Sequence, residues 1–338
     1  MKVLFIGGTG LISTAASKLA VQRGVDLYLL NRGNRMEFMP EGAKILRGDI
    51  NNQAEMESLL KDSHFDTVVD WIVFDPQAIE RDIKLFKGKT NQYILISTAA
   101  TYQRPLSHYI IDESTPQNNP GWDYAVKKLA CEERLIKEYR ESGFPITIVR
   151  PSHTYSKISI PYAINSGEYP WTLINRILKG KKIIVPGDGT SLWTITHNTD
   201  FAKGIVGLFG NIQTLGQAFH ITSDEVKTWD QYLKVIGQAI NKEPQIIHIA
   251  SECISEFFPE MKAGLLGDSC NSYVLDNSKI KRFVPDYVAT TNFENGIRQS
   301  IDYFKAHPEL QKIDEELDVK MDKFIAAYEN FVSNLAHL

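Results

Sequence analysis

The first half of the chain alternates short apolar runs with longer amphipathic segments. The apolar runs are typical of buried strands and are Val3–Ile6, Asp26–Leu30, Lys44–Leu46, Thr67–Ile72, Gln92–Ser97 and Ile146–Arg150. The segments between them repeat apolar residues at helical spacing and are Thr14–Arg23, Gln53–Lys61, Gln77–Phe86 and Tyr124–Ser142. Strands that alternate with helices over short links predict an α/β fold with a doubly wound parallel sheet, covered by helices on both faces.

The pattern becomes irregular after Pro151, where proline, glycine and aromatic residues interrupt it. We expect a smaller lobe to begin there. Asp200–Phe209 and Ala218–Ile221 predict one helix and one strand that return to the first sheet. The expected division is therefore 1–160 with about 198–221 for the first domain, and about 161–197 with 222–338 for the smaller lobe. The segment Leu310–Leu338 has helical spacing and predicts a docked helix.

A glycine-rich turn follows the first apolar run, with the sequence Gly7-Gly8-Thr9-Gly10. A strand, a glycine turn and a helix together are typical of a Rossmann-type dinucleotide-binding unit. Gly7 permits the tight turn, and Gly10 lets the backbone approach a pyrophosphate at the helix N-terminus. The third position, usually glycine, is Ser13, whose small side chain should still allow close packing. The alternative is an ordinary strand-to-helix turn.

Tyr124 and Lys128 lie four residues apart in a predicted helix, so both side chains point to one face. A nearby ammonium group favours the phenolate and lowers the pKa of a phenol, which is about 10 when free. The pair is therefore a candidate general acid/base unit that removes a proton from a hydroxyl. Lys127 lies about 100° further around the helix and should point elsewhere.

These residues, with Thr98 placed 26 residues before Tyr124, resemble the extended short-chain dehydrogenase/reductase family, which includes nucleotide-sugar epimerases and dehydratases. Further segments that look like family motifs are Arg150–Tyr155, Gly187–Gly189, Asp276–Lys279 and Asn295–Arg298. The resemblance covers about residues 1–307. It implies an NAD(P)-dependent enzyme in which Thr98 hydrogen-bonds the substrate, Tyr124 is the acid/base and Lys128 assists it. A strand-end threonine that only caps the next turn is the alternative for Thr98.

The resemblance also implies where the cofactor is held. Such contacts follow the carboxyl ends of the strands, and the expected residues are Gly7, Thr9, Gly10, Leu11, Ile12, Asn31, Arg32, Asp49, Ile50, Trp71, Ser97, Tyr124, Lys128, Pro151 and Ser152. NAD-preferring sites have an acidic residue after the second strand, but Asn31, Arg32 and Asn34 stand there. Arg32 or Arg35 could pair with a 2′-phosphate instead. We therefore expect NADP, with NAD as the alternative.

The substrate is less well defined by the sequence. Candidate contacts are His153, Arg176, Trp193 and Arg298, each of which could instead be an ordinary core or surface residue. We expect a nucleotide sugar. Trp71 departs from the small residues that are common in the epimerases, and it resembles an atypical branch that includes chloroplast stem-loop RNA-binding proteins. The alternatives are a carbonyl reductase for non-nucleotide substrates and an RNA-binding or regulatory protein on the same scaffold.

The composition of the chain argues against several classes of protein. The net charge of −4 argues against a broad nucleic-acid surface. Three scattered cysteines are too few for a disulfide framework or a zinc site, and we expect no metal. No apolar stretch approaches the ~20 residues that span a bilayer, and the N-terminus lacks a signal-peptide pattern. We therefore expect a cytoplasmic protein without membrane segments. The family resemblance further implies a homodimer that pairs through Gln77–Phe86 and Trp122–Ser142.

Overall fold

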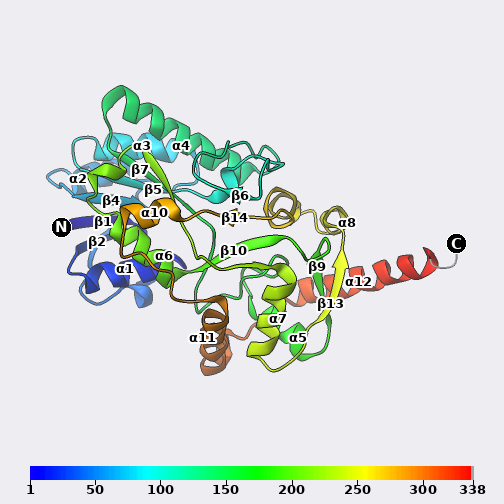
Figure 1. Ribbon diagram of the computed structural model, residues 1–338. Helices are drawn as coiled ribbons and strands as arrows, with labels where there is room; N and C mark the ends of the chain where they lie inside the picture. Colours follow the sequence, from blue (N-terminus) through cyan, green and yellow to red (C-terminus); the bar gives the residue numbers. More distant parts are fainter. Residues whose placement is uncertain (336–338) are drawn as a thin grey trace. The chain divides into compact units, whose positions relative to one another are not determined.

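The computed structural model, which describes residues 1–335, contains a parallel sheet of seven strands (Figure 1). The strand order is β11-β7-β5-β4-β1-β2-β3, and each pair of neighbours is parallel. The strands are β1 (Lys2–Ile6), β2 (Asp26–Asn31), β3 (Lys44–Arg47), β4 (Thr67–Asp70), β5 (Tyr93–Ile96), β7 (Ile146–Pro151) and β11 (Gln217–Ile221). The chain runs outward from β1 to β3 and then returns to the other side of β1, which confirms the doubly wound fold.

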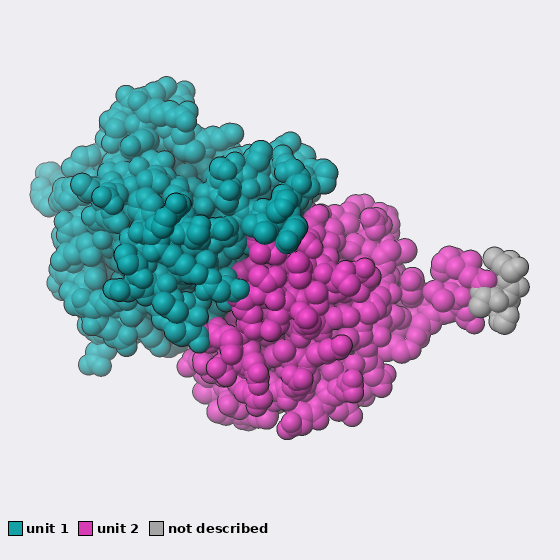
Figure 2. Space-filling model, in the orientation of Figure 1, with its two compact units in different colours: residues 1–154, 196–224, 275–290 teal, residues 155–195, 225–274, 291–338 magenta. Residues whose placement is uncertain are grey.

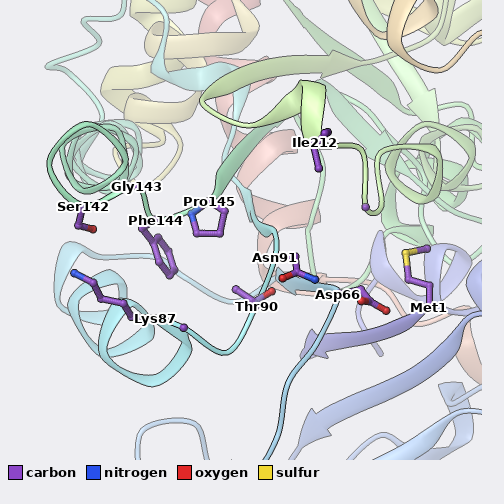
Figure 3. Close-up of a pocket in the computed structure, with 12 residues that line it drawn as sticks. Met1, Asp66, Lys87, Thr90, Asn91, Ser142, Gly143, Phe144, Pro145 and Ile212 are labelled. Carbon is purple, nitrogen blue, oxygen red and sulfur yellow. The ribbon is translucent and has the colours of Figure 1, made fainter.

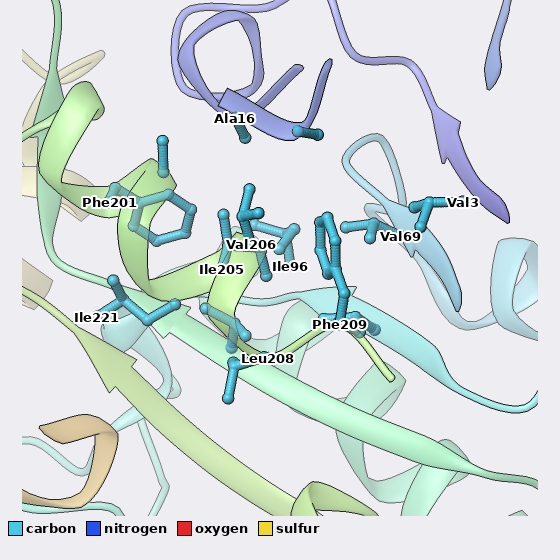
Figure 4. Packing of buried hydrophobic residues seen from close by; sticks show 14 of the residues in the cluster. Val3, Ala16, Val69, Ile96, Phe201, Ile205, Val206, Leu208, Phe209 and Ile221 are labelled. Carbon is cyan, nitrogen blue, oxygen red and sulfur yellow. The ribbon is translucent and has the colours of Figure 1, made fainter. Parts of the chain in front are cut away.

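Helices cover both faces of this sheet because successive strand residues point to opposite sides. Val3 and Phe5 belong to a core cluster with α1 (Ser13–Gln22), α6 (Asn198–Gly207) and α10 (Ser278–Phe283) (Figure 4). Leu4 and Ile6 belong to a second cluster on the opposite face. The helices of that face are α2 (Gln53–Leu59), α3 (Pro76–Phe86) and α4 (Asp123–Ser142).

The predicted elements of this sheet are all present, with ends that shift by one or two residues. The largest difference is β4, which ends at Asp70 rather than Ile72. Asp70 Oδ1 accepts a hydrogen bond from the Ile72 amide at 2.7 Å, which folds the backbone into a turn. The turn directs residues 71–74 over the carboxyl edge of the sheet, where the candidate site lies.

The chain divides into two compact units (Figure 2). Unit 1 contains residues 1–154, 196–224 and 275–290, and unit 2 contains residues 155–195, 225–274 and 291–338. The expected boundaries differ from this division, since residues 155–160 belong to unit 2 and residues 222–224 and 275–290 belong to unit 1. The last of these segments includes α10, whose Ile280 packs in the core of the first sheet. That long-range contact has no local signature in the sequence.

The region after Pro151 holds more regular structure than its irregular pattern indicates. Besides α6 and α10, its helices are α5 (Trp171–Leu178), α7 (Trp229–Ala239), α8 (Ser251–Phe257), α9 (Lys262–Gly264), α11 (Phe293–Ala306) and α12 (Glu315–Leu335). The remaining strands of the chain are short and are β6 (Ile110–Ile111), β8 (His153–Tyr155), β9 (Lys182–Pro186), β10 (Leu192–His197), β12 (Val226–Thr228), β13 (Gln245–Ile249) and β14 (Val274–Leu275). Single turns of other helix types are η1 (Met36–Phe38), η2 (Ala99–Thr101), η3 (Ile212–Thr214), η4 (Leu265–Ser269) and η5 (Pro308–Leu310).

The expected C-terminal helix is α12. It begins at Glu315, and the last three positions of the predicted segment, 336–338, lie outside the described residues. Leu317, Met321 and Phe324 are buried along one side. No helix within residues 1–335 has the length and apolar character that crossing a membrane requires.

Candidate functional site

A pocket of about 570 Å³ lies at the carboxyl ends of the strands, at the point beside β1 where the strand order reverses. This is the place where open α/β sheets bind ligands. Expected cofactor residues that line it are Gly7, Thr9, Gly10, Leu11, Ile12, Asn31, Arg32, Asp49, Ile50 and Trp71. Arg35, the other arginine suggested for a 2′-phosphate, also lines it, and the lining residues that were not among the expected contacts are Gly8, Ser13, Leu30, Asn34, Gly48, Asn51, Ile72 and Ile96. The structure therefore brings ten of the expected positions together in one cavity.

The glycine turn forms one wall of this pocket. Gly8 has φ +95°, and a β-carbon there would stand 2.7 Å from Leu29 Cδ2, so a side chain would strain both backbone and core. Ser13 Oγ accepts a hydrogen bond from the Gly10 amide at 2.8 Å. Thr14 Oγ1 donates to the Gly10 carbonyl at 2.6 Å. The serine at the usual third glycine position thus helps to hold the turn.

Two buried donors on this pocket have no partner among the described residues. They are Nδ2 of Asn31 and Nε1 of Trp71. Asn31 Oδ1 is already used, because it accepts from the Gly33 amide at 2.9 Å. An unpaired buried N–H costs free energy unless a ligand or water accepts from it. Free donors and a glycine turn fit a dinucleotide, whose phosphates and riboses are rich in acceptor oxygens.

Three arginines lie around the end of β2. Arg32 and Arg35 line the pocket. Arg47 is the register partner of Asn31 on β3, and its guanidinium packs against Gly33. Arg35 also lies over the ring of Phe38, 4.5 Å from its centroid. None of the three arginines forms a salt bridge within residues 1–335, which leaves their charge available to an anion.

Tyr124 and Lys128 lie in the first turns of α4, on one face as expected. Lys128 is 2% exposed, and its Nζ donates to the carbonyls of Val73 (2.5 Å) and Ile96 (2.8 Å). Burial lowers the pKa of Lys128 to about 8. The Tyr124 ring lies 5.2 Å from that of Trp122 between centroids. Because Ile96 also lines the candidate pocket, the Lys128 ammonium adjoins this pocket.

Thr98 lies two residues after the end of β5 and is the N-cap of η2. Its Oγ1 accepts from the Ala100 amide at 3.2 Å, so in this structure the hydroxyl caps the following turn. The hydroxyl of Ser97 donates to the carboxylate of Glu132, which also forms a buried salt bridge with Arg150. Ser97 therefore differs from the expectation, because its side chain is directed into the protein interior. Only its backbone remains for a cofactor contact.

Positions 151–153 form the end of β7 and the start of β8. Pro151 is buried, and the hydroxyl of Ser152 lies 2.8 Å from that of Thr196. Burial lowers the pKa of His153 to about 4, so its imidazole is neutral near pH 7. A neutral imidazole can donate one hydrogen bond to a substrate oxygen but supplies no charge for a diphosphate.

Three of the four expected substrate residues have structural contacts in unit 2. Arg176 is 1% exposed and forms salt bridges with Asp318 and Asp322 of α12. Trp193 is equally well buried: its ring stacks on Tyr273 at 5.2 Å, and its Nε1 donates to the Ser269 carbonyl.

These contacts correct the expectation for Arg176 and Trp193, because a fully packed side chain cannot also face a ligand. Arg298 lies on the surface of α11 and pairs with Glu294, one helical turn earlier. Arginine and tryptophan are residue types that often contact ligands, which is why the sequence suggested these positions. Whether such a side chain is buried or paired depends on the tertiary fold.

Another hollow of unit 1 is larger, about 810 Å³ (Figure 3). It lies at the opposite edge of the sheet, since Met1, Asp66 and Pro145 precede the amino ends of β1, β4 and β7. Its charged side chains are already paired. Lys87 binds Glu138, and Asp66 accepts from the Lys2 amide. Size alone therefore does not make this hollow the better candidate.

Comparison with known proteins agrees with the geometry of the pocket. The family model described as "NAD dependent epimerase/dehydratase family" matches residues 3–221. The chain is 27% identical over 263 residues to the chloroplast stem-loop binding protein of 41 kDa b from Arabidopsis thaliana, covering 73% of this chain. It is 28% identical over 210 residues to a UDP-glucose 4-epimerase of Lactobacillus helveticus, covering 56% of this chain. These matches span 65% and 62% of the two relatives' own lengths.

A solved structure shares the fold. It is UDP-glucuronic acid 4-epimerase from Bacillus cereus, in complex with UDP-glucuronic acid and NAD, with a TM-score of 0.72. The match covers 90% of this chain and 99% of that one, at 19% identity. At this identity the likeness is informative about the fold alone.

Proposed function

The chain belongs to the NAD dependent epimerase/dehydratase family, and from this premise we propose that it transiently oxidises a hydroxyl of a nucleotide-linked sugar, with NADP as its cofactor. The observation that carries the proposal is the position of Lys128. Its ammonium donates to the carbonyl of Ile96, a residue that lines the candidate cofactor pocket. An acid/base pair beside a dinucleotide pocket is the arrangement that alcohol oxidation requires.

Each residue has a defined task in this proposal. Tyr124 removes the proton from the substrate hydroxyl, and the positive charge of Lys128 favours the phenolate that does so. Thr98 exchanges its bond to the Ala100 amide for one to the substrate oxygen, since a hydroxyl can donate and accept. When bound, the nicotinamide supplies the hydride acceptor for the carbon that becomes a ketone. Epimerisation, dehydration and net reduction would all use this same arrangement of Thr98, Tyr124, Lys128 and the nicotinamide.

The choice of NADP is supported by charge. Arg32 and Arg35 line the pocket, Arg47 lies beside them, and Asn31 stands where an acid would accept from a ribose hydroxyl. A guanidinium forms strong, charge-assisted bonds with a phosphate. The proposed cofactor contacts are the pocket residues, with the Ser97 backbone, Tyr124, Lys128, Pro151 and Ser152 beyond them.

A nucleotide sugar is the proposed substrate because the chain aligns with a UDP-glucose 4-epimerase over 210 residues. His153, at the start of β8, remains the proposed contact outside the acid/base residues. Arg298 is exposed and could join it only by leaving Glu294, so we assign it no role.

A thermal-shift panel with NADP present tests the substrate. The panel contains UDP-, GDP- and dTDP-sugars, a simple ketone and a structured RNA. A ligand at a hundred times its dissociation constant should stabilise the protein by about 2.7 kcal/mol. We expect a shift with at least one nucleotide sugar. A shift with the ketone alone would instead indicate a carbonyl reductase.

RNA binding is a second candidate because of the similarity to a stem-loop binding protein over 263 residues. A melting shift with the RNA and with none of the sugars would favour it. The net charge of −4 and the presence of Tyr124 and Lys128 support the enzyme instead.

A further inference from the structure

Phe74 is an exposed aromatic residue directly beside the candidate acid/base pair. It is 53% exposed, although its neighbour Val73 is fully buried in the core. Asp75 accepts from the Ala78 amide at 2.9 Å and caps α3. The residues on both sides of Phe74 are thus fixed, which holds its ring at the carboxyl edge of the sheet rather than on a free loop.

The Phe74 ring contacts both members of the pair. Its centroid lies 4.8 Å from Lys128 Nζ and 6.5 Å from the centroid of the Tyr124 ring. The carbonyls of Val73 and Ile96 accept from the same ammonium. A cation over a ring face is attracted to it, and an apolar ring also excludes water.

We propose that Phe74 is a positioning residue of this site: its ring covers the Lys128 ammonium, keeps water from it and holds it against the carbonyls of Val73 and Ile96. The inference rests on the proposed function, because it gives Phe74 a role in the same acid/base unit. It explains why this chain has a large residue in the segment after β4. A covered ammonium acts on the phenol through a less polar medium, where its charge has a stronger effect.

Removing the ring has two opposing effects on Lys128. Loss of the attraction between ring and cation lowers the pKa, whereas entry of water raises it. Burial is the largest cause of the lowered pKa, and the charged or ionisable groups that act on Lys128 are Asp70, Cys131 and Glu132. These groups remain in place when only Phe74 changes. We therefore expect the effect of water to dominate and the pKa of Lys128 to rise from about 8.

Trace acetylation with acetic anhydride, followed by mass spectrometry of the peptide that contains both lysines, tests the proposal. Lys127 is the internal reference, since its side chain is 54% exposed and pairs with Asp123. In Phe74→Ala we expect the limiting rate of Lys128 at high pH, where both amines are deprotonated, to rise at least tenfold relative to Lys127, and its apparent pKa to move upward. An unchanged ratio and an unchanged pKa would overturn the role of Phe74.

Two further variants separate cover from folding. Phe74→Leu keeps an apolar cover without a ring face, so its Lys128 should stay slow to acetylate. Arg23→Ala, at the exposed end of α1, should match the parent protein. If Phe74→Ala has a lower melting temperature, its faster labelling could come from unfolding, and the Phe74→Leu variant then decides. If Lys128 of Phe74→Leu is acetylated as fast as in an unfolded control, the proposal that the Phe74 side chain covers Lys128 is wrong.

Cofactor binding is measured in a separate experiment, so that the proposed function and the role of Phe74 are tested independently. Titration of the parent protein with NADP and NAD, followed by tryptophan fluorescence, tests the proposed function without reference to Phe74. A protein that binds neither dinucleotide contradicts the proposed function. An unchanged labelling ratio contradicts the cover, whatever the titration shows.

Discussion

The guanidinium of Arg47 packs against Gly33, so closely that a β-carbon at position 33 would stand 3.3 Å from Arg47 Nε. Gly33 has φ +83°, a conformation that favours glycine. The contact connects the end of β3 to the loop that carries Arg32. The positive charge around the loop after β2 therefore includes Arg47, which lies sixteen residues beyond the end of that strand in the sequence.

The first prediction concerns cofactor preference. We expect NADP to bind more tightly than NAD, because the loop after β2 offers arginines and no carboxylate. Arg32→Ala should remove most of the preference, since a lost charge-assisted bond costs about 1.5–3 kcal/mol. Arg47→Ala should reduce the preference in the same direction. Fluorescence titration measures both, with Arg23→Ala at the exposed end of α1 as the control. Tighter binding of NAD by the parent protein would contradict the prediction.

The second prediction concerns the acid/base residue. Tyr124→Phe deletes one ionisable oxygen and should leave cofactor affinity nearly unchanged. Turnover of any true substrate should fall about 10²–10⁴-fold, the usual contribution of general acid/base catalysis. Steady-state rates and a cofactor titration of the same preparation measure the two effects. Turnover close to that of the parent would show that this helix pair has no catalytic role.

The third prediction concerns pH and stability. The pKa of Lys128 is about 8 in the folded protein and 10.5 when the side chain is not buried, as in the unfolded chain. Between these two pH values the unfolded chain therefore binds more protons than the folded protein. Folding stability should therefore rise with pH in this window. Relative to Lys128→Met, which cannot titrate, the parent should gain about 2 kcal/mol between pH 7 and pH 9.5. Urea unfolding at both pH values measures the difference. Parallel pH dependence in the two proteins would refute the lowered pKa.

The fourth prediction concerns the buried salt bridge between Arg176 and Asp318. Asp318→Ala leaves a buried guanidinium with fewer partners and should destabilise the protein by about 3 kcal/mol. The control is Glu294→Ala, which breaks the exposed pair with Arg298 and should cost less than about 1 kcal/mol. Urea unfolding of both variants tests the contrast. Equal losses would mean that the contact between α5 and α12 contributes little.

The fifth prediction is a homodimer through α3 and α4. On α4, Ile136 packs against the core and Tyr139 lies against Gly216, whereas Val126 is exposed and contributes to neither contact. Light scattering at micromolar concentration should give twice the chain mass, and Val126→Glu should shift it toward the monomer. A monomer mass for the parent protein would refute the dimer.

Local patterns in the sequence were sufficient to predict the sheet, its covering helices and the glycine turn. The period of apolar residues depends only on a segment's own geometry, and a positive φ requires glycine wherever the turn occurs. The spacing of Tyr124 and Lys128 is likewise local, because four residues form about one helical turn. Strand ends were less certain, as β4 shows, because the side chain of Asp70 ends that strand.

The tertiary structure decided what surrounds these residues. The carbonyls that bind Lys128 come from positions 55 and 32 residues away, and the partner of Arg176 is 142 residues away. The sequence alone therefore determined that a dinucleotide-binding fold with a Tyr-Lys pair is present. Only the fold decided that Arg176 and Trp193 are packed inside, that Arg47 lies beside Gly33 and that the Phe74 ring lies next to the Lys128 ammonium. The physical reason is that burial and pairing depend on which distant segments meet, and no local period records those contacts.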